Sequence, residues 1–500
     1  MLTLDGHSLT LEDVARVAAG AEAEVVLAPA ARAAILAARR VVETRIAAGE
    51  RVYGVTTGFG RLAEVVIAPE ARVALQRNVI RSHACGFGQA TGREGVRALL
   101  LLRANTLAHG HSGCTLEAVE MLLALLNRGI HPVVPEFGSV GASGDLVPLA
   151  HVALAMLGEG EAETGGRTIP AADALRAAGL KPLAVKEKDG LALINGTQYC
   201  SALGCLVLLE AERAVDALDT AGAMSLDALL GSPGPFAENV QAVREHPGQA
   251  ASAARLRALL AGSAIRESHR TGDPRVQDAY SLRCMPQVHG AARDALAYAR
   301  RVLEIEINSA TDNPLVFPES GEIVSGGNFH AQIVAQALDL VAIALADAAA
   351  IAERRVDRLL DPDSSGLPAF LAREPGVESG LMMLQTAVAD VLTEMRLLAS
   401  PASVHSVPTG AGREDHVSMG PAAARKAARA SRALSYVVAV ELVCAAEAIE
   451  HRRPLRSGPG VERALAAVRG AVPALAGDRP MGHGIERVAE MVREGIFSST

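Results

Sequence analysis

The chain has 500 residues, half of them hydrophobic, which is enough for a large buried core and for two or three domains. Aromatic residues make up only 3% and tryptophan is absent, so aliphatic side chains must provide most of the packing. The formal net charge of −8 is mild, and the basic residues form no long run. These features argue against nucleic acid or an anionic membrane as the main partner.

The sequence carries no recognisable targeting segment. Asp5 and His7 stand near the N-terminus, where a signal peptide would have a basic region followed by an apolar one. We expect no membrane span, because Asp339 and Asp347 interrupt the most apolar run, residues 338–351. The six cysteines include no Cys-x-x-Cys pair. We therefore predict a cytoplasmic protein whose cysteines are mostly reduced and buried.

The first hundred residues predict helices separated by one glycine-rich loop. Thr10 and Asp13 resemble a capping box that opens a helix over residues 11–19, and a second helix is expected over 28–48. Residues 51–60 read Arg-Val-Tyr-Gly-Val-Thr-Thr-Gly-Phe-Gly, which is typical of an irregular loop. No Lys-Ser/Thr follows it, so a phosphate-binding role is weak.

Helical sequence returns over residues 75–81 and ends at a histidine, His83, in the string Ser-His-Ala-Cys-Gly. A single histidine at a helix end is more often a hydrogen-bonded or capping residue than a ligand. Residues 95–129 are also helical, with an interruption near 110–113. His109 and His111 do not have a useful metal-ligand spacing, so we expect no metal site.

The stretch around which the chain is organised is residues 138–145, Gly-Ser-Val-Gly-Ala-Ser-Gly-Asp. It leads into an apolar helix over 146–157, with Asp145 as a predicted N-cap and Pro148 in the first turn, and Gly158 ends that helix. The free N–H groups of a helix N-terminus favour negative charge beside this loop. A serine-hydrolase elbow would need glycine at position 145, which is aspartate here.

Two further blocks carry polar residues in the middle of the chain. After a small β-containing flap over 159–189, residues 193–198 read Leu-Ile-Asn-Gly-Thr-Gln and precede a long apolar helix over 199–230. In residues 275–284, Tyr280 and Arg283 stand three apart and would share one face of a helix. The forked guanidinium of Arg283 suits a carboxylate, although a surface ion pair is the simpler alternative for an isolated arginine.

The last third of the chain predicts long helices joined by loops. The string Ser-Ala-Thr-Asp-Asn-Pro at 309–314 leads through a hairpin to residues 325–330, and helices follow over 331–358 and 382–398. Residues 414–419 form another polar loop, and the remainder is helical. Such sustained apolar content fits a bundle whose helices are covered on several sides.

Together these blocks resemble the aromatic amino acid ammonia-lyases over nearly the whole chain. In that family the Ala-Ser-Gly triplet cyclises: here the Gly144 nitrogen would attack the Ala142 carbonyl, and loss of water would leave Ser143 as a dehydroalanine. The product is a methylidene-imidazolone electrophile, abbreviated MIO, to which a substrate amine adds. The resemblance therefore implies an autocatalytically formed MIO group and no external cofactor.

The resemblance rests on six blocks, residues 53–60, 138–145, 193–198, 275–284, 309–314 and 414–419, and it implies roles for residues in and beside them. Tyr53 matches the base, Arg283 the carboxylate-binding residue, and Asn195 a residue that hydrogen-bonds the electrophile or the substrate. The catalytic residues implied are Tyr53, Ala142, Ser143, Gly144, Tyr280 and Glu414. The substrate-binding residues implied are His83, Asn195, Gln277, Arg283 and Phe329.

The resemblance implies a carbon-nitrogen lyase, and two positions favour histidine as its substrate. Glu414 accompanies histidine substrates in the family and could hold a protonated imidazole, and His83 indicates a polar substrate side chain. Gly412 and Arg413 depart from the Asn-Gln that usually precedes this glutamate, and Arg413 could pair with Glu414. The expected reaction converts L-histidine to trans-urocanate and ammonia, the first step of histidine degradation.

For the fold, the resemblance implies a mainly α protein with two domains. An N-terminal domain, residues 1–200, would carry the MIO loop, and a long-helix bundle, residues 201–500, would form the core of a homotetramer with active sites shared between subunits. Two alternatives remain. One is a tyrosine or phenylalanine ammonia-lyase, or an aminomutase, that uses the same electrophile, and the other is a non-catalytic scaffold with this fold.

Overall fold

The computed structural model describes residues 1–21 and 24–498, which form two compact units. Unit 1 comprises Met1–Leu206, Arg300–Leu338 and Pro401–Arg425. Unit 2 comprises Val207–Ala299, Asp339–Ser400 and Lys426–Thr500. The two-domain division at residues 200 and 201 that the sequence suggests stays a prediction.

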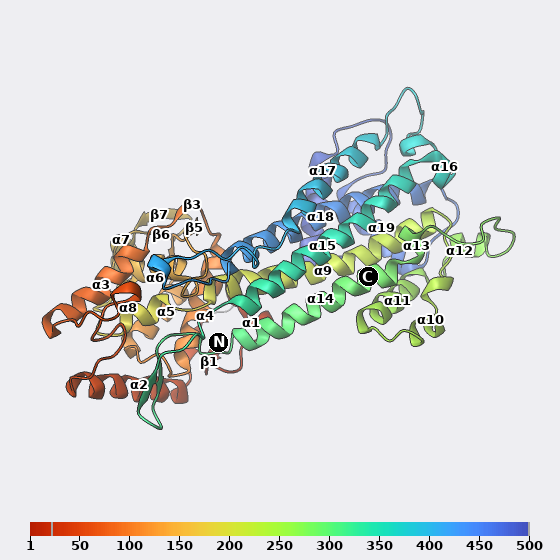
Figure 1. The fold of residues 1–500 in the computed structure, drawn as a ribbon. Helices are drawn as coiled ribbons and strands as arrows, with labels where there is room; N and C mark the ends of the chain where they lie inside the picture. Colours follow the sequence, from red (N-terminus) through yellow and green to blue (C-terminus); the bar gives the residue numbers. More distant parts are fainter. Residues whose placement is uncertain (22–23, 499–500) are drawn as a thin grey trace. The chain divides into compact units, whose positions relative to one another are not determined.

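Unit 1 combines short helices with small sheets (Figure 1). Its helices are α1 (Leu11–Ala18), α2 (Pro29–Ala47), α3 (Arg72–His83), α4 (Arg93–Ala108), α5 (Leu116–Asn127), α6 (Leu146–Met156), α7 (Ala171–Ala177) and α8 (Asp189–Ile194), with 3₁₀ turns η1 (Gly60–Leu62), η2 (Pro69–Ala71) and η5 (Gly410–Gly412). Its strands are β1 (Leu2–Leu4), β2 (Val25–Leu27), β3 (Phe87–Ala90), β4 (His131–Pro132), β5 (Pro135–Phe137), β6 (Glu161–Thr164), β7 (Arg167–Pro170), β8 (Leu315–Phe317) and β9 (Glu322–Val324).

The strands of unit 1 pair in small groups. β1 pairs with β2 in parallel, β3 pairs with β5 antiparallel, β4, β6 and β7 form a three-stranded antiparallel sheet, and β8 and β9 form a hairpin. The β3–β5 pair matters for function, because it joins the end of α3, where His83 lies, to the strand that leads into residues 138–145.

Unit 2 is built almost entirely from helices (Figure 1). They are α10 (Glu238–Ala242), α11 (Pro247–Leu260), α12 (Ala264–Ser268), α13 (Tyr280–Arg283), α16 (Pro362–Ser365), α17 (Met382–Leu398), α19 (Pro459–Ala471) and α20 (Gly482–Glu494), with η3 (Gly234–Phe236) and η4 (Ala369–Leu371). The helices α9 (Gln198–Ala228), α14 (Met285–Glu306), α15 (Gln332–Leu360) and α18 (Gly420–Glu450) have residues in both units.

Local sequence signals explain where several helices begin and end. The Thr10 hydroxyl accepts a hydrogen bond from the Asp13 N–H, and the Asp13 carboxylate accepts one from the Thr10 N–H, so the predicted capping box is confirmed. Pro148 lies in the first turn of α6, and Gly158 follows its C-cap with φ of +76°, a conformation that glycine adopts easily. The mainly helical fold class is confirmed.

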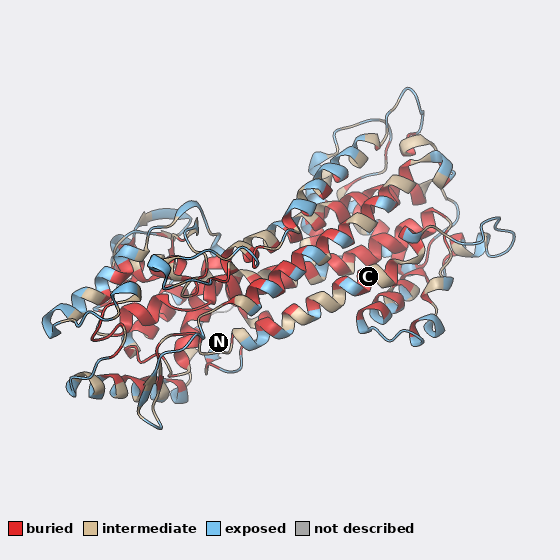
Figure 2. Ribbon diagram, in the orientation of Figure 1, coloured by how far each residue is buried: buried red, intermediate tan, exposed pale blue. Residues whose placement is uncertain are grey.

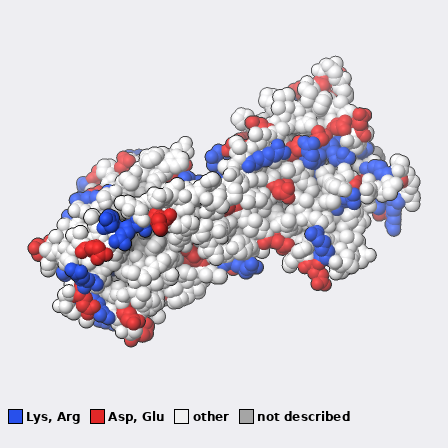
Figure 3. Space-filling view, in the orientation of Figure 1, with Lys and Arg blue, Asp and Glu red and all other residues white. Residues whose placement is uncertain are grey.

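The core consists of aliphatic side chains, as the composition predicts. Helix α9 is buried along nearly all of its length (Figure 2). Cys114, Cys200, Cys205 and Cys444 are buried with free thiols, whereas Cys85 is exposed. On the face drawn in Figure 3, acidic and basic side chains are interspersed.

Helix α15 bears on the expectation that the chain has no membrane span. By length and composition alone it could cross a membrane, although Asp339 and Asp347 interrupt its apolar sequence, so that expectation stays a prediction. One such helix is weak evidence, because core helices pass the same test, and 56% of its most apolar 18-residue window is buried. Asp339 is itself buried, and its Oδ1 accepts a hydrogen bond from Lys426 Nζ at 2.6 Å. Pairing inside the protein thus accounts for a carboxylate in this apolar helix.

Candidate active site

The loop of residues 138–145 joins β5 to α6 and is held against the segment before α9. The Asp145 N–H donates to the Gly196 carbonyl oxygen at 2.6 Å, and Gly144 forms an isolated bridge with Gly196. Gly144 has φ of +73°, and a Cβ at this position would lie 2.1 Å from the Gly196 carbonyl oxygen. Only glycine fits position 144, because both the backbone conformation and the close approach exclude a side chain.

The other side of this loop contacts the residues that begin α18. The Met419 N–H donates to the Val140 carbonyl oxygen at 2.9 Å, and a Cβ on Gly141 would lie 2.2 Å from Ser418 Oγ. The loop therefore lies at the N-termini of α6, α9 and α18 together. Helix N-termini carry partial positive charge, so this is a place where developing negative charge is stabilised.

The sequence predicts the position of Asp145 correctly but not the group to which its side chain bonds. Asp145 occupies the N-cap position of α6, but its side chain makes no capping bond there. Its Oδ2 accepts a hydrogen bond from the Cys200 N–H at 2.8 Å, in the first turn of α9. Complete burial raises the pKa of Asp145 to about 6, and its backbone hydrogen bonds work in the opposite direction. Asp145 thus joins the two helix starts instead of capping its own.

Tyr53 lies in the irregular loop of residues 51–60 predicted from the sequence. The backbone N–H of Gly60 donates to Tyr53 Oη at 3.0 Å, and a donor at this distance stabilises negative charge on the oxygen. The Tyr53 ring packs edge-on against Phe59, with 6.3 Å between ring centroids. Tyr53 also lines a pocket of about 420 Å³ together with Arg45 and Pro314.

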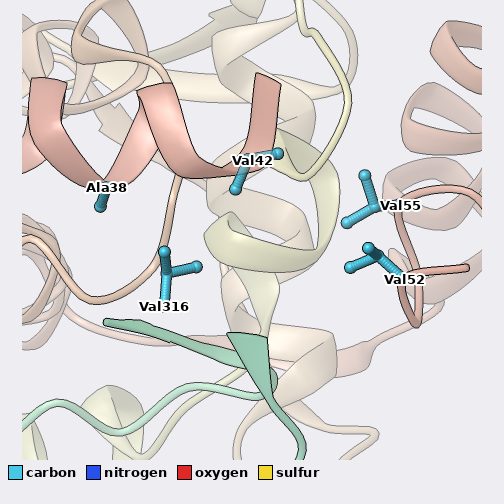
Figure 4. Close-up of a cluster of buried hydrophobic side chains, with 5 residues drawn as sticks. All are labelled: Ala38, Val42, Val52, Val55 and Val316. Atoms are coloured by element: carbon cyan, nitrogen blue, oxygen red, sulfur yellow. The ribbon is translucent and has the colours of Figure 1, made fainter. Parts of the chain in front are cut away.

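The Tyr53 loop is held by apolar contacts on one side. Its neighbours Val52 and Val55 are buried with Ala38 and Val42 of α2 and with Val316 of β8 (Figure 4). Because these side chains come from three separate segments, they fix the loop that carries Tyr53 to the body of unit 1.

On the other side, a residue that the sequence analysis missed holds the Tyr53 loop. The amide of Gln76, fully buried on α3, donates to the Gly54 carbonyl oxygen at 2.9 Å and accepts from the Gly190 N–H at 3.0 Å. Gln76 therefore links the loop beside Tyr53 to α8, the helix that immediately precedes Asn195. A buried glutamine must find such partners, but the sequence does not say which ones.

Asn195 follows the last residue of α8 and is 1% exposed. Its Nδ2 donates to Asp312 Oδ1 at 3.1 Å and to the Asn313 carbonyl oxygen at 2.9 Å. These contacts bring two of the predicted blocks, 193–198 and 309–314, together. The Asn195 Oδ1 atom is buried without a hydrogen-bond partner.

His83 is half-buried at the end of α3. Its Nδ1 lies 2.8 Å from the Val79 carbonyl oxygen, and because a carbonyl only accepts, Nδ1 must carry the proton. The strand that follows pairs with β5, and the Gly86 N–H donates to His151 Nε2 at 3.0 Å. The histidine block and the 138–145 loop are thus neighbours, and His83 Nε2 is the ring nitrogen that remains to interact with other groups.

Glu414 lies half-buried in a loop that contacts the end of the Tyr53 loop. Its Oε2 accepts a hydrogen bond from Thr409 Oγ1 at 2.6 Å, and η5 contacts η1. The guanidinium of Arg413 lies 4.0 Å from the carboxylate of Glu64. The suggestion that Arg413 pairs with Glu414 was therefore wrong: Arg413 faces another carboxylate.

Phe329 is half-buried at the end of the loop that follows β9. The next residue, His330, lies with its Nε2 3.2 Å from the His416 carbonyl oxygen, and the two imidazole rings stack at an interplanar angle of 5°. These contacts place the Phe329 and Glu414 loops side by side in unit 1.

The remaining predicted site residues belong to unit 2. Gln277 is exposed, Tyr280 is 70% exposed, and the Arg283 guanidinium lies over the Tyr280 ring, 4.5 Å from its centroid. The predicted shared helical face of Tyr280 and Arg283 is confirmed, in the short helix α13. Arg283 Nε is buried without a partner. The site residues that the resemblance implies are therefore divided between the two units. Unit 1 contains Tyr53, His83, Ser143, Asn195, Phe329 and Glu414.

The triad loop has the features that a methylidene-imidazolone requires. Gly144 lies where an added Cβ would clash with the Gly196 backbone, so its nitrogen is unhindered, and Ser143 is half-buried. The residues present fit the group. In residues 1–21 and 24–498, no group of three or more His, Cys, Asp or Glu side chains is arranged to hold a metal ion.

Comparisons with known proteins identify the family. The family model described as "Aromatic amino acid lyase" matches residues 9–470. The histidine ammonia-lyase of Anaeromyxobacter sp. (strain K) is 53% identical over 502 residues, covering 99% of each chain. The chain belongs to the aromatic amino acid lyase family.

Two solved structures share the fold. The histidine ammonia-lyase from Trypanosoma cruzi has a TM-score of 0.92 and 39% identity, covering 100% of this chain and 94% of its own. The tyrosine aminomutase from Streptomyces globisporus has a TM-score of 0.94 and 38% identity, covering 99% and 97%. The fold is therefore shared by lyases and mutases, so it does not by itself choose a substrate.

Proposed function

We propose that this chain is a histidine ammonia-lyase, which converts L-histidine to trans-urocanate and ammonia in the first step of histidine degradation. The observation that carries the proposal is the 53% identity, over 99% of each chain, to a protein named for this activity. Two half-buried side chains, His83 and Glu414, support it, because both suit an imidazole substrate.

We further propose that residues 142–144 carry a methylidene-imidazolone formed from Ala142, Ser143 and Gly144. When formed, the group supplies an electrophile for the amino group of the substrate. The triad lies at the starts of α6, α9 and α18, so helix N-termini stabilise negative charge there. No external cofactor is needed.

Tyr53 would act as the base that removes a β-proton from the substrate. To act as a base, Tyr53 must first lose its own proton, and the Gly60 N–H, which donates to the Tyr53 oxygen at 3.0 Å, stabilises the resulting phenolate; taking the β-proton then returns Tyr53 to the neutral phenol. The contacts of Val52 and Val55 hold the loop in place, so the hydroxyl is positioned before the substrate arrives.

Glu414 and His83 would bind the imidazole ring of the substrate. The Glu414 carboxylate favours the protonated ring, and a protonated ring makes the neighbouring β-carbon proton more acidic. His83 has Nε2 available, since Nδ1 donates to the Val79 carbonyl oxygen. Phe329 would add an apolar contact from the adjacent loop.

Arg283 would bind the substrate carboxylate through its guanidinium fork, with Gln277 and Tyr280 beside it. These three residues are in unit 2, and Val276 and Tyr280 are 101% and 70% exposed in the single chain. We propose that the enzyme is a homotetramer in which neighbouring subunits cover this segment and share their active sites.

A cytoplasmic location fits the buried free thiols of Cys114, Cys200, Cys205 and Cys444.

A second candidate is a tyrosine or phenylalanine ammonia-lyase or an aminomutase that uses the same electrophile. The structural similarity to a tyrosine aminomutase, with a TM-score of 0.94, supports this second candidate. The two candidates make different products, because a lyase releases urocanate, coumarate or cinnamate, whereas a mutase returns ammonia to the β-carbon.

The test is a substrate panel with product analysis on the purified protein. We expect urocanate from L-histidine, and neither coumarate from L-tyrosine, nor cinnamate from L-phenylalanine, nor a β-amino acid. In Glu414→Gln, we expect kcat/KM for L-histidine to fall about 10- to 100-fold, because a neutral amide no longer favours the imidazolium. Coumarate or a β-amino acid as the main product would overturn histidine as the substrate.

A further inference from the structure

The buried side chains around Asn195 fix which end of its amide is free. Both hydrogens of Asn195 Nδ2 are committed, to Asp312 Oδ1 at 3.1 Å and to the Asn313 carbonyl oxygen at 2.9 Å. The Asn195 Oδ1 atom is the part of the amide without a partner, and it is buried. An unpaired buried acceptor is costly unless something donates to it.

The amide cannot be turned around, because its partners only accept. The Asn313 partner is a backbone carbonyl. Asp312 is 0% exposed, its Oδ2 accepts from Lys188 Nζ at 3.0 Å, and its Oδ1 also accepts from the Asn313 N–H at 2.6 Å. Both oxygens of this carboxylate are thus used as acceptors, so a flipped Asn195 would place its own oxygen against them.

Lys188 holds the Asp312 carboxylate in place, and its backbone adopts an unusual conformation. Its side chain is 0% exposed and forms the ion pair with Asp312. Its backbone has φ of +75°, a left-handed conformation that a lysine rarely adopts. Residues held in such conformations are retained where the surrounding structure over-determines them, often at functional sites.

The backbone of Asn195 is fixed as well. The guanidinium of Arg103, also 0% exposed, donates from Nη1 to the Asn195 carbonyl oxygen at 2.9 Å and to Gln198 Oε1 at 2.6 Å. The next residue, Gly196, contacts Gly144 of the triad. The free amide oxygen therefore belongs to a rigidly held residue next to the reacting loop.

We infer that Lys188 and Asp312 are positioning residues that hold Asn195 with its amide oxygen free, so that Asn195 accepts a hydrogen bond from the amino group of the amino-acid substrate. The inference rests on the proposed function. A free amide oxygen cannot donate to the substrate carboxylate, so Asn195 recognises the amine and Arg283 the carboxylate. This division assigns each polar end of the substrate to a side chain of matching hydrogen-bonding character.

The test compares two ligands that differ only by an amino group. Ser143→Ala serves as the parent, so that L-histidine binds without turning over, and imidazole propanoate serves as the ligand that keeps the ring and the carboxylate but lacks the amine. Calorimetry measures both dissociation constants in the full-length parent and in parents that carry Asp312→Asn or Lys188→Met. We expect L-histidine to bind at least about tenfold more weakly in both, and imidazole propanoate to bind within about twofold of the parent.

Asp189→Asn is the matched control. Asp189 is a buried carboxylate at the start of α8, directly after Lys188. Its oxygens accept hydrogen bonds from the Thr115 N–H at 2.7 Å and from the Lys186 N–H at 2.8 Å. It should leave the ratio of the two dissociation constants unchanged. Equal weakening of both ligands by Asp312→Asn, or no weakening of L-histidine, would overturn the inference, because a merely structural role does not distinguish an amine.

Two further results keep the test decisive. If Asp312→Asn and Lys188→Met fail to fold, Asn195→Ala must give the same amine-specific loss, and an equal loss for both ligands would overturn the inference. If the parent binds neither ligand and the wild-type chain makes no urocanate, the proposed function itself fails and the inference fails with it. Urocanate formation together with unselective binding losses overturns the inference alone.

Discussion

The residues around Asn195 in unit 1 and the segment 276–283 in unit 2 differ sharply in how the chain holds them. Asn195 hydrogen-bonds to two fully buried residues, Arg103 and Asp312, and Asp312 in turn pairs with the buried Lys188. In the other segment, Tyr280 is 70% exposed. Hydrogen bonds within the chain therefore fix the part of the proposed site around Asn195, whereas in the part proposed to bind the carboxylate Tyr280 is exposed and Arg283 is half-buried.

The largest expected effect comes from removing the Ser143 hydroxyl in unit 1, which the proposed electrophile needs for its formation. Ser143→Ala should lower urocanate formation by at least about 10⁴-fold, which is more than about 5 kcal/mol of transition-state stabilisation, because no electrophile can form. Ser143 is half-buried in a loop, so far-ultraviolet circular dichroism and thermal unfolding should match the wild type. An active Ser143→Ala enzyme would contradict the electrophile assignment.

The next effect concerns Tyr53, the proposed base in unit 1. Tyr53→Phe should lower kcat by about 10²- to 10⁴-fold with little change in KM, because the ring still packs on Phe59 but the proton acceptor is lost. Steady-state kinetics with L-histidine provide the measurement. The control is Tyr436→Phe, which removes only a hydroxyl that donates to Glu486 at 3.1 Å on an exposed surface. Equal losses in the two variants would remove Tyr53 from its proposed role.

A third effect appears in stability and pH rather than in turnover. Burial raises the pKa of Asp145 to about 6, above its ordinary value of 3.8, so the folded state holds the proton more tightly than the unfolded state. The contribution of Asp145 to the free energy of unfolding is therefore fully present below about pH 4. It is lost as the pH rises through about 6, and the loss is at most about 3 kcal/mol. Asp145→Asn should remove this loss in denaturant unfolding.

Asp227, in the unit 2 part of α9, provides a matched variant for the same experiment. Its burial also raises its pKa to about 6, so Asp227→Asn should show the same change in pH dependence. A wild-type stability that stays constant between about pH 4 and 6 would contradict the assignment of buried, hard-to-ionise carboxylates.

The smallest of these effects tests the exposed segment. Arg283→Lys should lower kcat/KM about 10- to 100-fold, because lysine keeps the charge but loses the fork that binds both carboxylate oxygens. Unfolding should change little. Arg270→Lys, in an exposed pair with Glu267, is the control and should leave kinetics unchanged. A normal kcat/KM in Arg283→Lys would mean that another group binds the carboxylate.

The sequence predicts features that depend on neighbours along the chain. The capping box of Thr10 and Asp13, the position of Pro148 and the shared face of Tyr280 and Arg283 involve residues within three positions of one another or at one helix end, and all three predictions are confirmed. Local geometry determines them, so no tertiary contact could overturn them easily.

The sequence does not predict partners that lie far apart in the chain. Asp145 bonds to Cys200, and Lys188 pairs with Asp312, 124 positions away. Gln76 joins two loops that no local pattern connects. The roles of the six-block residues come from family resemblance, whereas the buried residues that hold them are visible only once the chain is folded.

The central claim is tested most directly by mixing the purified wild-type protein with L-histidine and following the near-ultraviolet absorbance of urocanate. We predict a steady rise in absorbance, with one ammonia released for each urocanate. No urocanate from a folded protein that converts L-tyrosine or L-phenylalanine instead would contradict the account, and it would mean that His83 and Glu414 do not select an imidazole.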